Sequence, residues 1–201
     1  MKNLLVLMII VVAPATLVGQ NTDSCGVHHA GLFFEVAALP FLHASSTLGN
    51  GGVNVTISPG YVIGENSAVL VSFQSGSESL ADEMTRPASG RMLIGGASLE
   101  VLRYFGESAV YRRPFVGVGG GLTTLLQKVS GRGYNGNCAF LEGGVQWEVS
   151  DNLYLRTALQ YRWVHWFNFV GTLNADESFS SFTDGEIALG VTVAFYPNIT
   201  P

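Results

Sequence analysis

The sequence predicts an all-β fold, an eight-stranded antiparallel up-and-down transmembrane β-barrel. Three observations support this prediction: long segments alternate apolar and polar residues, their connections are short and long in turn, and charge is scarce. Charged residues form 12% of the 201-residue chain, about half of the average for soluble proteins. The only lysines are Lys2 and Lys128, although soluble sheets usually protect their exposed edges with lysine.

The alternation is clearest in residues 153–169. Their odd positions, from Leu153 to Phe169, are almost all apolar, whereas the even positions include Arg156, Gln160 and Arg162. Only a β-strand separates two faces with a period of two. Residues 186–196 repeat the pattern, with apolar side chains on one face and mostly very small ones on the other. Such segments are typical of strands between lipid and a narrow polar lumen.

Eight segments with this period lie between clusters of Gly, Asn, Ser and Asp, and each is expected to form a strand. The expected strands are 30–42, 52–63, 67–75, 91–104, 109–125, 138–149, 153–169 and 185–196. Crossing a bilayer takes about 9–11 tilted residues, which several of these exceed. An even number of antiparallel strands also closes into a barrel without a free edge.

The apolar parity of each segment is assigned to the lipid-facing side. In the first four segments it consists of Leu32, Phe34, Val36, Ala38, Val53, Val55, Ile57, Val69, Val71, Phe73, Leu93, Ala97, Leu99 and Val101. The next two segments contribute Val116, Val118, Leu122, Leu141, Val145, Trp147 and Val149. The last two segments contribute the apolar faces of residues 153–169 and 186–196. Gly117, Gly119 and Gly121 take the opposite parity, where small residues suit a crowded lumen.

The connections alternate in length. Residues 64–66, 105–108 and 150–152 form short ones, whereas 43–51, 76–90, 126–137 and 170–184 are longer and polar. Short inner turns and long outer loops are typical of outer-membrane barrels. If the chain starts on the periplasmic side, every long loop lies outside.

The polar parity predicts a charge network inside the barrel. Its members are Glu35, Glu100, Arg113, Glu142, Glu148, Arg156, Arg162 and Glu186. An eight-stranded barrel has room for side chains or one small ligand, so we expect the network to plug the lumen. A tight turn at 151–153 would place Glu148 opposite Arg156 and Glu142 opposite Arg162. Sliding the register by two residues would instead give Gln146–Arg156 and Glu142–Gln160 pairs.

Aromatic residues are expected at the two membrane interfaces. Those assigned to the girdles are Tyr61, Trp147, Tyr161, Trp163 and Phe167.

Residues 1–19 are interpreted as a cleaved signal peptide, and residues 20–201 as the barrel domain. Lys2 precedes the apolar segment 4–12, and residues 17–19 end in the small residue expected before a cleavage site. An anchoring helix is the alternative, which the short apolar core and Pro14 disfavour. No later segment offers about 20 apolar residues in a row, so a membrane span would have to be a closed barrel.

The formal net charge of −5 argues against a nucleic-acid partner. The only cysteines, Cys25 and Cys138, are expected at opposite sides of the membrane, so a disulfide between them is disfavoured. The spacing of histidines and cysteines indicates no metal site and no cofactor. The adjacent His28 and His29 would face opposite sides of a strand.

Three other interpretations were weighed. A soluble β-sandwich would show the same alternation of apolar and polar residues. A narrow channel for small or hydrophobic solutes would have the same polar interior. A lipid-modifying enzyme would need a catalytic base. His165 is the best candidate for that base, but Ser178, Ser180 and Ser181 lie in a loop, and no catalytic residue is assigned.

Residues 58–66, Ser-Pro-Gly-Tyr-Val-Ile-Gly-Glu-Asn, resemble the strand-turn signature "SPGYF-x-x-DN" of small bacterial outer-membrane β-barrel proteins of the OmpA/OmpX-like and PorT-like type. Residues 102–105 and 144–153 are similar to later motifs of that family. One departure is that Phe195-Tyr196 is followed by residues 197–201, whereas such barrels often finish on an aromatic residue.

The resemblance implies insertion into the outer membrane of a Gram-negative-type bacterium by the barrel-assembly machinery. It also implies contact with outer-membrane lipid and a structural or surface-interaction role, in which the long loops meet an extracellular or envelope partner.

Overall fold

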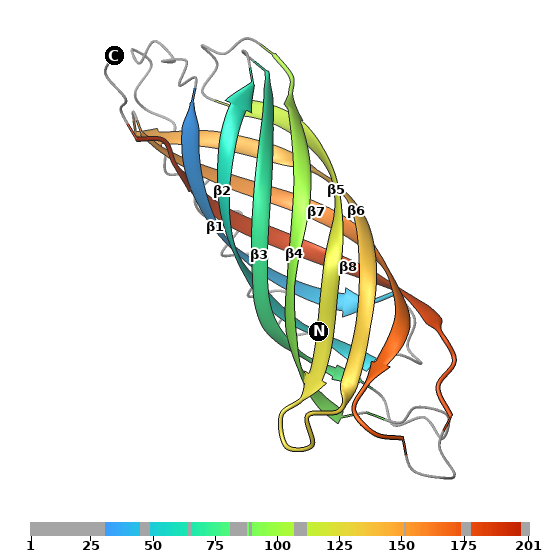
Figure 1. Cartoon of the computed structure of the whole chain (residues 1–201). Coiled ribbons are helices and arrows are strands. Elements are labelled where there is room, and N and C mark those ends of the chain that lie inside the picture. Colours follow the sequence, from blue (N-terminus) through green and yellow to red (C-terminus); the bar gives the residue numbers. More distant parts are fainter. Residues whose placement is uncertain are drawn as a thin grey trace.

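The computed structural model describes residues 31–44, 49–63, 66–80, 88, 90–106, 112–150, 152–173 and 178–197. The expected signal peptide lies outside these residues. Eight strands form one closed barrel (Figure 1): β1 (Leu32–His43), β2 (Gly49–Ile63), β3 (Ser67–Leu80), β4 (Gly90–Tyr104), β5 (Arg112–Gln127), β6 (Gly133–Ser150), β7 (Leu153–Val170) and β8 (Phe182–Phe195). Within the described ranges, no helix is long and apolar enough to span a membrane.

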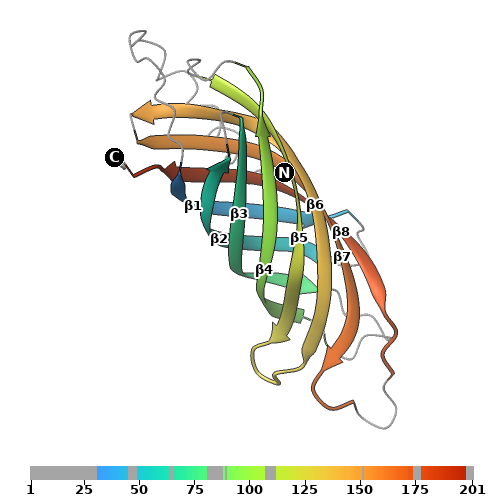
Figure 2. The ribbon, with the colours of Figure 1, turned by 45° about the horizontal axis from the view of Figure 1, so that its top comes forward.

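Every strand pairs antiparallel with its neighbour in sequence, and β1 pairs with β8 to close the ring. The strands are steeply tilted around a single interior (Figure 2). The connections after β1, β3, β5 and β7 meet at one end, called here the long-loop end, and those after β2, β4 and β6 meet at the other, the short-turn end. The predicted alternation in length is only partly correct, because the connection after β4, residues 105–111, is longer than 44–48 after β1 and 128–132 after β5. β5 begins at Arg112 rather than 109, and strands extend into the expected loops at the opposite end. The predicted fold class is confirmed.

Several strands extend further toward the long-loop end than predicted. β3 continues to Leu80 rather than residue 75, β6 begins at Gly133 rather than 138, and β8 begins at Phe182 rather than 185. Residues 76–79, which contain one Gly and two Ser, were expected in a loop. They keep their pairing because they are hydrogen-bonded to strands on both sides, β2 and β4.

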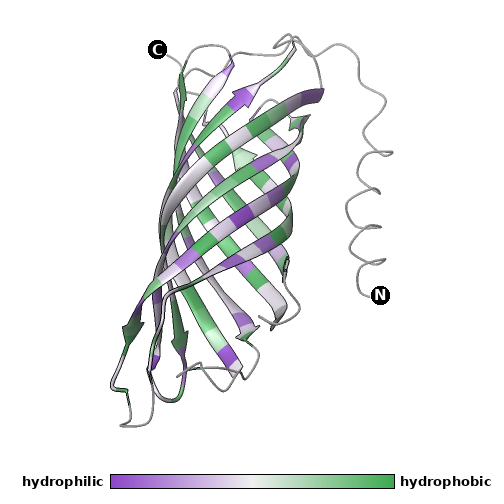
Figure 3. Ribbon diagram, turned by 90° about the vertical axis from the view of Figure 1, so that its right-hand side faces the viewer, coloured by the Kyte–Doolittle hydropathy of each residue, from purple (hydrophilic) through white to green (hydrophobic). Residues whose placement is uncertain are grey.

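The predicted separation of faces is confirmed along the barrel. Leu99 is 54% exposed, whereas its neighbour Glu100 is 5% exposed. Hydrophobic and hydrophilic residues alternate along the strands (Figure 3). The exposed apolar side chains include Leu32, Phe34, Val36, Val53, Val55, Ile57, Val71, Phe73, Leu93, Val101, Val116, Val118, Leu122, Leu141, Val149, Leu159, Ile187, Val193 and Phe195. An apolar exterior of this extent is typical of a lipid-contacting surface.

Glycine on the inward face makes room for larger side chains. A Cβ added to Gly119 would lie within 2.2 Å of the Phe140 ring, and one added to Gly117 within 2.9 Å of both Glu142 and Glu100. The glycines of β5 therefore relieve crowding in the interior, as the sequence predicts.

The exterior generates a prediction about stability in a bilayer. Leu99 lies near the middle of β4 and faces outward, so Leu99→Arg would place a cation in the hydrocarbon layer. We expect the free energy of unfolding in lipid vesicles to fall by about 2–4 kcal/mol. The matched control is Val129→Arg, since Val129 is 96% exposed in the turn after β5 and should tolerate charge. Equal stability of the two variants would contradict a lipid-facing wall.

Candidate functional site in the barrel interior

The interior consists of three sections. An apolar cluster closes the short-turn end, formed by Phe33, Ala68, Leu70, Leu102, Tyr104, Phe115, Ala158, Ala194 and Tyr196. A second apolar cluster closes the long-loop end, formed by Phe41, Leu80, Ala88, Met92, Ile94, Leu125, Tyr134, Cys138, Val164, Trp166 and Ala188. These are called the short-turn cluster and the long-loop cluster. Charged residues lie between them and also beside the long-loop cluster, where the His43–Glu186 pair is two residues nearer the long-loop end than Phe41 and Ala188.

Aromatic rings dominate the short-turn cluster. Phe33 stacks on Tyr196 with ring centroids 4.8 Å apart and an interplanar angle of 10°, and Tyr104 lies against Phe115. The ring of Phe33 occupies the space beside Gly60, where an added Cβ would lie 2.4 Å from it. Phe33 and Phe115 are almost completely buried, so these rings pack in the interior at that end.

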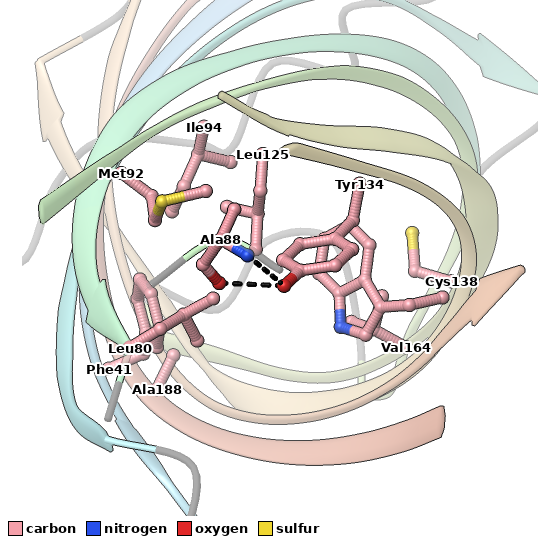
Figure 4. Packing of buried hydrophobic residues seen from close by; sticks show 11 residues of the cluster. Phe41, Leu80, Ala88, Met92, Ile94, Leu125, Tyr134, Cys138, Val164 and Ala188 are labelled. Carbon is pink, nitrogen blue, oxygen red and sulfur yellow. Dashed lines mark hydrogen bonds between the residues drawn. The ribbon is translucent and has the colours of Figure 1, made fainter. Parts of the chain in front are cut away.

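Tyr134 organises the long-loop cluster (Figure 4). Its hydroxyl donates a hydrogen bond to the carbonyl oxygen of Ala88 at 2.6 Å and accepts one from the Ala88 N–H at 3.0 Å. Its ring contacts those of Trp166 and Phe182, with centroids 6.3 and 5.4 Å away. Ala88 lies outside both β3 and β4. A residue of the β3–β4 connection thus completes the closure.

Arg156 lies at the centre of the first charge cluster. Its Nη1 and Nη2 donate hydrogen bonds to Glu35 Oε1 and Oε2 at 3.0 and 2.7 Å, a bidentate geometry that strengthens the pair. Nη2 also lies 3.8 Å from Glu142 Oε1. The guanidinium carbon is 5.0 Å from the centroid of the Phe115 ring, a cation–π contact.

The Glu35–Arg156 pair spans a strand. Glu35 lies on β1 and Arg156 on β7, and β8 lies between them. The β8 residues paired with them are Ala194 and Thr192, respectively. Because these inward side chains are small, the long Glu and Arg side chains can meet above them.

The predicted pairing of β6 with β7 is wrong by two residues. Glu148 is opposite Tyr154, Gln146 opposite Arg156, and Glu142 opposite Gln160, so Glu148–Arg156 and Glu142–Arg162 are not cross-strand pairs. The reason is a bulge between Glu148 and Ser150, after which Ser150 pairs with Leu153. The bulge accounts for one residue of the shift, and the pairing of Ser150 with Leu153 rather than Tyr154 accounts for the other. Together they give the second register that the sequence allowed.

Two expected members of the network lie apart from it. Arg113 donates a hydrogen bond to Asn66 Oδ1 at 2.7 Å and lies over the Tyr104 ring at 5.0 Å, near the short-turn end. Glu148 is half-buried beside Tyr154. Neither residue contacts Arg156 or Arg162 through an ion pair among the described residues.

A second charge cluster lies toward the long-loop end. Arg162 Nη1 is 3.3 Å from Glu186 Oε2, and His43 Nδ1 donates a hydrogen bond to Asp184 Oδ2 at 2.5 Å. Glu186 is opposite Arg162 on one side and His43 on the other. Glu78 is buried within electrostatic range of all of them.

Sequence reasoning missed His43, Glu78 and Asp184, because it placed all three in loops. A signal was present. Each continues the inward parity of its strand, His43 from Glu35 and Phe41, and Asp184 from Glu186. Following the period of two past the last apolar residue of each strand would have identified all three as inward-facing.

Between the two charge clusters lies a cavity of about 40 Å³. Its lining includes Glu35, Ser72, Glu100, Cys138, Glu142, Arg156, Gln160 and Arg162. One buried water needs roughly 10–15 Å³ on the same measure, so the cavity has room for a few water molecules only.

The expected interfacial aromatics face outward at different heights. Tyr61, Trp163 and Phe167 are 54%, 42% and 49% exposed, and Trp147 and Tyr161 are partly exposed. The rings of Tyr161 and Trp163 touch edge to face at 4.4 Å. By contrast, Tyr104 and Trp166, also aromatic and near strand ends, point inward and belong to the apolar clusters.

Of the remaining candidate residues, His165 lies on the outward face and Cys138 lies in the interior. His165 is exposed and its Nδ1 lies 3.2 Å from Thr183 Oγ1. This contact supplies neither the serine nucleophile nor the carboxylate that would accompany a catalytic base. Cys138 is a buried free thiol. Cys25, His28 and His29 lie outside the described residues.

Comparison with known proteins identifies the fold. No protein-family model and no curated protein sequence matches the chain. Among solved structures, Neisserial surface protein A matches with a TM-score of 0.61 and 16% identity, over 84% of this chain and 98% of that one. OprG from Pseudomonas aeruginosa gives 0.53 and 12%, over 87% and 100%. Outer membrane protein W of E. coli gives 0.50 and 19%, over 85% and 100%.

This chain has the fold of small outer-membrane β-barrels. The finer resemblance to the OmpA/OmpX-like and PorT-like type stays a prediction.

The first charge cluster generates a prediction about stability. Arg156→Met would leave Glu35, Glu100 and Glu142 buried around an apolar side chain, and we expect it to lower the free energy of unfolding by about 3–5 kcal/mol. Glu35→Gln should cost less, because Arg156 still faces Glu142. The matched control is Arg103→Met, since Arg103 is an exposed arginine. Urea unfolding followed by tryptophan fluorescence measures all three, and an Arg156→Met variant as stable as the control would contradict the cluster's role.

Proposed function

We propose that this protein is an integral outer-membrane β-barrel with a plugged polar lumen and a structural or surface-interaction role. The observation that carries this proposal is the filling of the interior. Apolar clusters close both ends, and the charged section between them encloses a cavity of only about 40 Å³. An eight-stranded barrel filled in this way transports no hydrated solute.

The exterior supports the placement in a membrane. All eight strands expose large apolar side chains on the outward face, for which water would be a poor solvent. A cleaved signal peptide and insertion by the barrel-assembly machinery follow from the same proposal. Outer-membrane lipid is then the partner of the barrel wall.

The long-loop end would carry any specific interaction, because the loops of a rigid barrel are free to vary while the wall is not. The β5–β6 and β7–β8 hairpins reach furthest at this end (Figures 1 and 2). An extracellular or envelope protein would therefore meet these hairpins first. The proposal assigns no catalytic role and no cofactor.

Conductance tests the plugged lumen. We expect refolded protein in planar lipid bilayers to give no stable, large conductance steps, because charge pairs and two apolar clusters block the path. Heat-modifiable gel mobility would establish that the inserted protein is folded. Stable, large steps from folded protein would contradict the proposal.

Passage of small or hydrophobic solutes is the second candidate function. The observation that favours it is the closure of the long-loop end by Ala88, a residue outside the strands, through contacts with a single tyrosine. A plug that depends on a connection can open more easily than one built from strand residues alone.

Labelling of Cys138 distinguishes the two candidates. In a Cys25→Ser background, a water-soluble maleimide should label wild-type Cys138 slowly, because the long-loop cluster covers it. Tyr134→Ala should label faster, since it removes both the ring contacts and the Ala88 hydrogen bonds. Tyr134→Phe keeps the ring but loses both hydrogen bonds to Ala88, and its labelling rate should lie between those of wild type and Tyr134→Ala. Rapid labelling of the wild type would favour solute passage.

A further inference from the structure

We propose that the second charge cluster is a binding site for a divalent transition-metal ion, with His43, Asp184 and Glu186 as ligands. The site lies at the long-loop end of the interior and does not depend on whether the lumen conducts. The spacing of residues along the sequence gave no indication of it, because the ligands come from β1 and β8, which meet only when the barrel closes.

The geometry brings three donor groups together. One ligand atom each from His43, Asp184 and Glu186 lies within 4.8 Å of the other two. His43 and Glu186 are direct partners across β1 and β8, and Asp184 precedes Glu186 by two residues on the same face. Zinc holds nitrogen and oxygen ligands at about 2.0–2.2 Å, so side-chain adjustments of about 1 Å would close the three donors around one ion.

Three buried side-chain atoms of the cluster have no hydrogen-bond partner in the described part of the chain: Arg162 Nη2 and one atom on each of two proposed ligands. The two ligand atoms are His43 Nε2 and Asp184 Oδ1, on side chains that are only 1% and 2% exposed. Buried polar atoms are nearly always satisfied, and an exception often indicates a missing ion or water. An imidazole nitrogen and a carboxylate oxygen are donor types that bind a transition-metal cation.

The charge of the cluster also suits a dication. Glu78, Asp184 and Glu186 are acidic and Arg162 is basic, so with neutral His43 the formal charge of these buried groups is −2. Uncompensated charge is costly in a protein interior. One divalent ion would neutralise it. Arg162 would then hold the Glu186 carboxylate from behind, at 3.3 Å, which is the position of a group that orients a ligand.

The donor set selects the class of metal. One imidazole with two carboxylates suits Zn²⁺ and its first-row neighbours, whereas Ca²⁺ and Mg²⁺ prefer sites made of oxygen alone. Three protein ligands leave at least one coordination position for water or for a group offered by a partner at the long-loop end.

Titration with Co²⁺ and Zn²⁺ tests the site in the refolded, tag-free, full-length chain after treatment with a chelator. We expect one Co²⁺ per chain, with visible absorption bands of a bound ion, displaced by Zn²⁺ but not by Mg²⁺. Asp184→Asn removes the charge without changing the shape and should weaken Co²⁺ binding by at least tenfold. His43→Ala should weaken it at least as much.

The other histidines of the chain supply the controls. His165→Ala and the double variant His28→Ala/His29→Ala should bind Co²⁺ as wild type does. Heat-modifiable mobility confirms that each variant is folded, and Asp184→Asn keeps the test valid if His43→Ala does not refold. Absence of stoichiometric binding would overturn the proposal, as would binding that survives Asp184→Asn and is lost in the His28/His29 variant.

Discussion

Closure of eight strands into one ring is the constraint on which the rest of the structure depends. Closure gives every residue of a strand one of two environments, the interior of the ring or its outward face. Leu99 and Glu100 are neighbours in sequence, yet Leu99 faces outward, whereas Glu100 is buried in the interior near Arg156. The hydrophobic exterior and the polar interior are therefore two consequences of the same ring.

A soluble protein usually keeps its charged residues on the surface, whereas this barrel buries charged residues inside and exposes apolar ones outside. This arrangement explains the ion pairs of the interior. Charges that would be solvated on a soluble sheet are buried here, so each must find a partner within reach. Arg156 and Glu35 do so across β8, and Arg162 and Glu186 across one ladder. In the second cluster, Glu78, Asp184 and Glu186 still outnumber the single guanidinium of Arg162, which is the physical reason that a cation would be bound there.

The sequence was sufficient to predict the fold class, the number of strands and the direction of most side chains, because a period of two is a local property. It was not sufficient for the contacts between strands. The bulge at Glu148 and Ser150 shifts the register, and nothing in the local pattern requires it. The Glu35–Arg156 pair joins residues 121 positions apart, on strands that meet only through barrel closure. His43, Glu78 and Asp184 were missed because polar strand ends resemble loops.

The most direct test of this account is a spin-label scan of β7 at residues 155–164, in a background without Cys25 and Cys138. The protein would be refolded in lipid vesicles, and each label's access to oxygen and to a water-soluble nickel complex measured. The account predicts that odd positions such as Leu159 are accessible to oxygen, as lipid-facing sites are, and that even positions such as Ala158 are shielded from nickel. Even positions that nickel reaches freely, or a strand without alternation, would contradict it.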